Sequence, residues 1–184
     1  MSNRVNETMT AAEYRRRTQG QQDLGLGEEK DAPDEVVAID PGKESGLAWT
    51  DGERVATGTA SFWPICDQKT PWAELLPIRR TAWTLAVRRQ RMRIILEAPY
   101  RSAVGKRSHN QTAIAYSSGR VAREAELLRD RLTEQGYDVV EMDPSRLDGK
   151  WSSKTAGRIV GEWTGHDNEH TRDALRLLVS HGYI

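Results

Sequence analysis

The sequence predicts an α/β domain with a central mixed sheet of five strands flanked by helices. Three short runs rich in β-branched or small residues come first, and two later strand-like runs alternate with segments whose apolar residues recur at helical spacing. The pair Asp51-Gly52, which favours a tight hairpin turn, separates the second run from the third. The expected order is βββαβαβαα, and 184 residues of which 37% are apolar suit one ordinary core.

The first three predicted strands cover residues 36–40, 45–50 and 54–60, and a two-residue turn joins the last two. A connection rich in Trp and Pro follows, and residues 78–92 then carry apolar side chains at helical spacing behind a proline. The fourth strand covers residues 94–96 and is followed by a glutamate and then a proline, which stops the strand.

The longest helical pattern covers residues 110–135, and a glycine directly after it suits a helix end. The fifth strand is expected over residues 137–142. A weaker helix follows over residues 152–163, and the segment 167–182 predicts a last helix that Gly182 ends.

Residues 1–34 are polar, carry both charge signs and lack periodicity, which predicts a flexible tail before one folded domain at residues 35–184. No run approaches the roughly 18 apolar residues of a membrane span, and the N-terminus lacks the apolar stretch of a signal peptide. The single cysteine, Cys66, cannot form an internal disulfide, which agrees with a reducing compartment. We therefore expect a soluble protein of the cytoplasm with no membrane partner.

The formal net charge of the chain is zero, but the charges are unevenly distributed. Many arginines lie between Arg79 and Arg107, and Glu97 is the one acidic residue among them. A solvated helix face and a phosphate-binding surface would explain these arginines about equally well.

Four polar residues are expected to converge at one edge of the sheet. Asp40 and Glu97 each follow a short apolar strand, so their carboxylates emerge together if the two strands are neighbours. His170 and Asp173 are three positions apart, which places them on the same face of the last helix.

Three carboxylates in one place repel one another, and a hard divalent cation with oxygen ligands relieves that repulsion. Mg²⁺ fits best, and Mn²⁺ is expected to substitute. Two such ions about 3.5–4 Å apart could stabilise both the attacking and the leaving oxygen of a phosphodiester, so hydrolysis of a nucleic-acid backbone is the natural reaction. His170 could be a metal ligand or a proton carrier.

Each of these residues also has an ordinary structural explanation. Asp40 could begin a turn with Pro41-Gly42, and Glu97 could be a surface charge at a strand end. His170 and Asp173 could solvate or cap a helix. Asp167 shares their helix face, but it lies where an N-cap belongs, so we expect it to cap the helix.

Four segments resemble, in order, the catalytic and core blocks of RuvC-type Holliday junction resolvases: AIDPGKESGLAW, IILEAPY, SSGRVAREAELL and HTRDALRLLVSH. The resemblance covers about residues 35–182. It implies a ribonuclease H-like fold in which Asp40, Glu97, His170 and Asp173 bind Mg²⁺ and cleave DNA.

The resemblance also implies a homodimer that contacts its partner through the 110–135 helix and nicks opposing strands of a four-way DNA junction. Tyr100 is the candidate for a contact with bases at the junction centre. Phosphate contacts are expected from further basic residues: Arg101, Lys106, Arg107, Lys150 and Lys154. The tail and the arginine-rich segment are more typical of a phage-encoded relative, which would act in the host-cell cytoplasm on junctions or on flaps and forks.

Other functions remain open at this stage. The chain could be a ribonuclease H-like nuclease that acts on RNA or on an RNA/DNA hybrid. It could also be a non-catalytic module that binds nucleic acid through its arginines. Half of an actin-like ATPase also begins with a strand ending in Asp, but that fold needs a second, larger lobe, and no P-loop motif is present.

Overall fold

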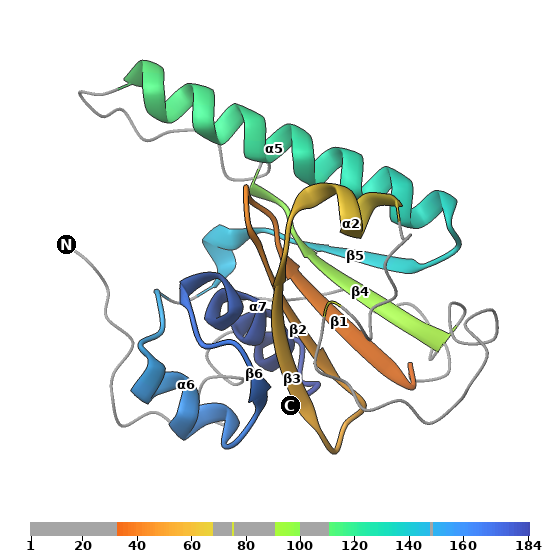
Figure 1. Cartoon of the computed structure of the whole chain (residues 1–184), viewed down its shortest axis with the longest axis vertical. Coiled ribbons are helices and arrows are strands. Elements are labelled where there is room, and N and C mark those ends of the chain that lie inside the picture. Colours follow the sequence, from red (N-terminus) through yellow and green to blue (C-terminus); the bar gives the residue numbers. More distant parts are fainter. Residues whose placement is uncertain (1–32, 68–74, 76–90, 100–110, 148) are drawn as a thin grey trace.

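A mixed six-stranded sheet flanked by helices forms the centre of the computed structural model, which describes residues 33–67, 75, 91–99, 111–147 and 149–184 (Figure 1). The strands are β1 Glu35–Asp40, β2 Ser45–Thr50, β3 Val55–Ala60, β4 Met92–Glu97, β5 Asp138–Met142 and β6 Thr164–Gly165. The helices are α2 Phe62–Asp67, α5 Gln111–Glu134, α6 Ser153–Val160 and α7 Glu169–Ser180, with a short 3-10 helix at Pro144–Arg146.

The strand order across the sheet is β5-β4-β1-β2-β3-β6. The β1, β2 and β3 strands pair antiparallel as the predicted meander, whereas β4 pairs parallel to β1 and β5 pairs parallel to β4. The α/β class and the mixed, helix-flanked sheet are therefore confirmed.

The predicted count of five strands is wrong, because β6 adds a sixth strand parallel to β3. The Thr57 hydroxyl donates a hydrogen bond of 2.5 Å to the carbonyl oxygen of His166, just past β6. Two residues of strand are too short to show the alternation on which a sequence-based assignment depends.

Side chains alternate between the two faces of the sheet, and each face has its own apolar core. Val36 and Ala38 of β1 pack in the core beneath α6 and α7. Val37 and Ile39 pack in the other core, which includes Leu128 of α5 and residues of α2 (Figure 1). Burial on both faces explains why β1 is a continuous apolar run.

Several local predictions needed correction. The β2–β3 connection has four residues instead of two, because the Asp51 carboxylate accepts hydrogen bonds from the backbone amides of Glu53 at 3.2 Å and Arg54 at 2.8 Å. The helix α2 in the Trp-rich connection was not predicted. Most of the helix predicted over 78–92 lies outside the described residues, although its last residue belongs to β4.

The last helix begins one residue later than expected. Asn168, not Asp167, is the N-cap of α7, and it forms a capping box with Thr171. Asp167 instead forms an ion pair of 2.6 Å with Arg172 and accepts a hydrogen bond from Ser153 of α6. It therefore ties the two helices together.

The helix predicted over 152–163 is shorter in the structure, since α6 ends at Val160. Residues 1–32 of the predicted tail lie outside the described part of the chain. Among the helices that the structure describes, none is long and apolar enough to cross a membrane.

Candidate active site

Asp40 and Glu97 end neighbouring parallel strands at the same edge of the sheet. In the β1–β4 register, Ile39 pairs with Leu96, so the next residue on each strand is one of the two acids. Asp40 shares the alternation of Ala38, and Glu97 shares that of Ile95, which both belong to the core on the α7 side. Both carboxyl groups are therefore directed to the face that α7 covers.

The first two turns of α7 bring His170 and Asp173 to this edge. The His170 Nδ1 atom lies 2.8 Å from Asp40 Oδ2, and the two side chains come from residues 130 positions apart in the sequence. The Asp173 side chain is only 4% exposed, whereas that of His170 is 47% exposed. His170 thus lies at the solvent side of the site, and Asp173 lies at its buried side.

Gly46 allows this close approach between α7 and the sheet. It pairs with Asp40 in the β1–β2 register. A Cβ atom at Gly46 would overlap the carbonyl group of His170 and would lie 2.7 Å from the backbone nitrogen of Thr171. The missing side chain therefore sets the position of His170, a role that was not predicted from the sequence.

The carboxyl groups of Asp40 and Glu97 have strongly perturbed pKa values. Burial raises the pKa of Asp40 to about 6, against the lowering effect of a hydrogen bond from Glu97. Burial and then the Asp40 charge raise the pKa of Glu97 to about 8. The Asp173 charge raises both pKa values further, and a side-chain hydrogen bond joins Glu97 and Asp40.

Two cations partly offset the negative charge of this cluster. The Lys150 ammonium lies 2.5 Å from Asp173 Oδ2 and 2.7 Å from Glu169 Oε1. The Arg176 guanidinium is buried on α7, 3.6 Å from Asp173 Oδ1, and it lowers the pKa of both Asp40 and Glu97.

Arg176 was not among the site residues predicted from the sequence, although a signal was present. Arg176 follows Asp173 by three positions, which places both on one face of α7. An arginine three positions after an aspartate on a helix indicates an ion pair between the two side chains.

The donor set fits a hard divalent cation in its chemistry. Within the described residues, no three acidic, histidine or cysteine side chains are already grouped as metal ligands. However, Asp173 Oδ1 is a buried oxygen that accepts no hydrogen bond from the described part of the chain. Together with two carboxyls whose pKa values are raised by burial and by neighbouring negative charge, this oxygen is the kind of acceptor that Mg²⁺ or Mn²⁺ would satisfy.

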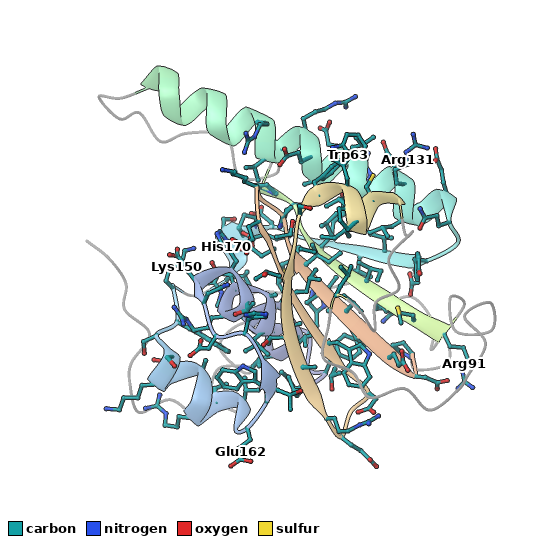
Figure 2. All side chains as sticks on the ribbon, in the orientation of Figure 1. Trp63, Arg91, Arg131, Lys150, Glu162 and His170 are labelled. Atoms are coloured by element: carbon teal, nitrogen blue, oxygen red, sulfur yellow. The ribbon has the colours of Figure 1, made fainter. Side chains whose placement is uncertain are left out.

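The predicted nucleic-acid contacts are only partly visible. Tyr100, Arg101, Lys106 and Arg107 lie outside the described residues. Lys154 is exposed on α6. Figure 2 shows Lys150 and His170 near each other at the start of α7, so this lysine belongs to the carboxylate cluster. Its contact with a phosphate stays a prediction.

The predicted dimer helix also packs within its own chain. Ala125, Leu128 and Leu132 form a buried stripe of α5, and the two leucines contribute to the core on that face of the sheet. A partner subunit would therefore meet another side of α5.

Comparison with known proteins identifies no relative: no family model matches the chain, and neither a curated protein nor a solved structure is significantly similar to it.

Proposed function

We propose that this protein is a metal-dependent, structure-selective endonuclease with a ribonuclease H-like fold that cuts four-way DNA junctions. One observation carries the proposal. Asp40 at the end of β1, Glu97 at the end of β4, and His170 and Asp173 on α7 converge, although they come from three separate parts of the sequence. Acids with raised pKa values in one cluster are typical of functional sites.

The sheet topology supports this proposal. Five strands in the order β5-β4-β1-β2-β3, with β2 antiparallel to its neighbours, resemble the arrangement expected for a ribonuclease H-like domain. The site then lies where parallel strands end, the usual place for catalysis in an open α/β sheet. The β6 strand adds to the far side of β3 and does not change the site edge.

Asp40, Glu97 and Asp173 would hold Mg²⁺ or Mn²⁺. When bound, the cation supplies charge stabilisation for a phosphodiester and for the attacking water. Asp40 orients the His170 ring through Nδ1, and the half-exposed ring can carry a proton to or from solvent. Arg176 keeps positive charge beside the acids, which favours their ionised forms.

The choice of a four-way junction as substrate rests on the resemblance to RuvC-type resolvases. A homodimer with a two-fold axis would suit the near two-fold symmetry of the junction. The predicted phosphate contacts would position the DNA without reading its sequence.

Cleavage assays on defined substrates test the proposal. The full chain is mixed with end-labelled four-way junction, linear duplex, flap and RNA/DNA hybrid, each with Mg²⁺ or with chelator, beside the Asp173→Asn variant. We expect paired symmetric nicks in the junction that disappear with chelator and in the variant. Cleavage of the hybrid alone would assign the protein to ribonucleases, and junction binding without any cleavage would leave a binding module.

A further inference from the structure

The Lys150 ammonium contacts two acids of α7, and one of them is Asp173, the most buried acid of the site. The ammonium lies 2.5 Å from Asp173 Oδ2 and 2.7 Å from Glu169 Oε1. The lysine side chain is 63% exposed, whereas Asp173 is 4% exposed, so the ammonium reaches into the site from the solvent side (Figure 2).

The backbone on both sides of Lys150 is fixed to α7. Arg176 Nη1 donates a hydrogen bond of 2.9 Å to the carbonyl oxygen of Gly149, and Arg172 Nε donates one of 3.1 Å to the carbonyl oxygen of Trp151. The Trp151 side chain is buried in the core beneath α7. The loop therefore holds the start of the lysine side chain beside the first turns of α7, while its four-carbon stem leaves the ammonium free to change partner.

We propose that Lys150 is a built-in competitor of the divalent metal ion for Asp173, an inference that rests on the proposed function. The lone pair of Asp173 Oδ2 that accepts the hydrogen bond from Lys150 cannot coordinate a metal ion while the ammonium is 2.5 Å away. Two cations at one carboxylate also repel each other strongly in a buried site. Asp173 Oδ1 accepts no hydrogen bond from the described residues, so a metal ion bound there would meet the lysine charge close by, and a metal ion that also takes Oδ2 must displace the lysine.

Glu169 can keep the Lys150 ammonium in an ion pair after the ammonium leaves Asp173. It lies on α7 one turn before Asp173 and already contacts the lysine at 2.7 Å. The ammonium can thus release Asp173 and keep an anionic partner at the solvent side of the site. In that position it also stands where a DNA phosphate would approach, which agrees with the phosphate contact predicted from the sequence.

The inference is tested by metal affinity, not by cleavage. Mn²⁺ binding to the full chain is measured by calorimetry and by the electron paramagnetic resonance signal of free Mn²⁺, without DNA. Lys150→Met should tighten Mn²⁺ binding about tenfold, since it removes a charge-assisted hydrogen bond that the metal must break. Lys150→Arg, which retains the charge, should bind no more tightly than the wild type.

Lys43→Met is the matched control. Lys43 is an exposed lysine in the turn that follows Asp40, so its loss removes the same charge near the site without altering the Asp173 contact. We expect its Mn²⁺ affinity to change by less than about twofold, because an exposed charge is screened by solvent and salt. Circular dichroism checks that each variant is folded.

The outcomes separate this inference from the proposed function. Suppose that the wild type binds Mn²⁺ and that Asp40→Asn abolishes this binding. If Lys150→Met then binds Mn²⁺ no more tightly than the wild type, the competitor role alone is overturned. Equal tightening in Lys150→Met and Lys43→Met also overturns it, since general electrostatics would then explain the effect. Mn²⁺ binding that is absent from both the wild type and Lys150→Met, or that Asp40→Asn leaves unchanged, overturns the metal site itself.

Discussion

The two ends of strand β4 differ in how their charged side chains are arranged. At its carboxyl end, Glu97 joins Asp40 and Asp173 in a cluster of like charges. Near its start, Arg93 forms an ion pair of 2.7 Å with Asp138 of β5 and donates a hydrogen bond of 2.7 Å to the Tyr183 hydroxyl. The second arrangement pairs opposite charges and ties the C-terminal segment to the sheet.

The histidines at the two ends of α7 differ in their exposure and in their surroundings. His170 is half-exposed and contacts Asp40, whereas His181 is largely buried at the helix C-cap. Burial, with a contribution from Arg93, lowers the pKa of His181 to about 4. One end of the helix thus holds polar groups available to solvent and ligands, and the other holds a histidine kept neutral by its surroundings.

This difference indicates that one end contributes mainly to stability and that the other is the candidate for chemistry. Carboxyls with raised pKa values cost folding free energy at neutral pH, and a fold retains such groups when they have a function. The paired end joins opposite charges and fixes the C-terminal segment, so it contributes to stability. Substitutions at the two ends should therefore have separable effects on cleavage and on unfolding.

The largest effect is expected from the carboxylates of the site edge. Asp40→Asn and Glu97→Gln should each lower junction cleavage about a thousandfold or more, because each removes an anionic oxygen from the proposed metal site. Folding and junction binding should persist. Single-turnover cleavage, gel-shift binding and circular dichroism measure the three properties.

Glu44→Gln serves as the control for these variants, because Glu44 is an exposed acid in the turn after Asp40. It should retain cleavage within about twofold of the wild type. Unfolding of both carboxylate variants, with intact Glu44→Gln, would show that the acids are structural.

Gly46→Ala tests how closely α7 must approach the site edge. The new methyl group would overlap the His170 carbonyl, so the helix start must move and the His170–Asp40 contact must weaken. We expect a loss of about 3 kcal/mol in the free energy of unfolding, together with about tenfold slower cleavage. Urea denaturation and cleavage rates provide the measurements.

Gly42→Ala is the matched control in the turn that precedes β2, because its Cβ atom would meet only the Glu44 carbonyl oxygen at an ordinary 3.7 Å. It should change the free energy of unfolding by less than about 1 kcal/mol. Equal effects of the two substitutions would contradict the close-approach role of Gly46.

Glu97→Gln should also stabilise the protein when chelator is present and the pH is about 8. The raised pKa of Glu97 means that the folded state keeps a proton that the unfolded state releases, so wild-type stability falls as pH rises from about 4.5 to about 8. The neutral glutamine avoids this loss, on the order of 3 kcal/mol. Thermal unfolding from pH 4 to 9 should show the gain only at the higher pH values, and a gain independent of pH would count against this cause.

His181→Phe should reveal the opposite pH dependence at the other end of α7. With a folded pKa lowered to about 4, His181 contributes stability that is complete above about pH 6.5 and is lost as pH falls toward 4. The phenyl ring keeps a similar shape and cannot take up a proton, so the variant should lose up to about 2 kcal/mol less than the wild type over that range. Parallel curves for the two proteins would show that this histidine does not titrate on unfolding.

Much of the fold could be predicted because its signals are local. Alternation in the strands and helical spacing in α5 and α7 depend only on neighbouring residues, and they identified five of the six strands. The short β6 strand depends on Thr57 as a distant partner, so no local pattern indicates it. The N-cap was predicted at Asp167 and is Asn168 in the structure, because the position of a cap depends on backbone geometry that changes from one residue to the next.

The sequence alone determined where the acids stand on their own elements: Asp40 and Glu97 at the ends of apolar strands, and Asp173 one turn after His170. The contacts between distant segments are visible in the structure alone: β4 pairs with β1, Gly46 lets α7 approach the sheet, and Lys150 and Arg176 contact Asp173. The reason is physical. Position along a strand or helix follows from a repeat of a few residues, whereas contacts between distant segments depend on how whole elements pack.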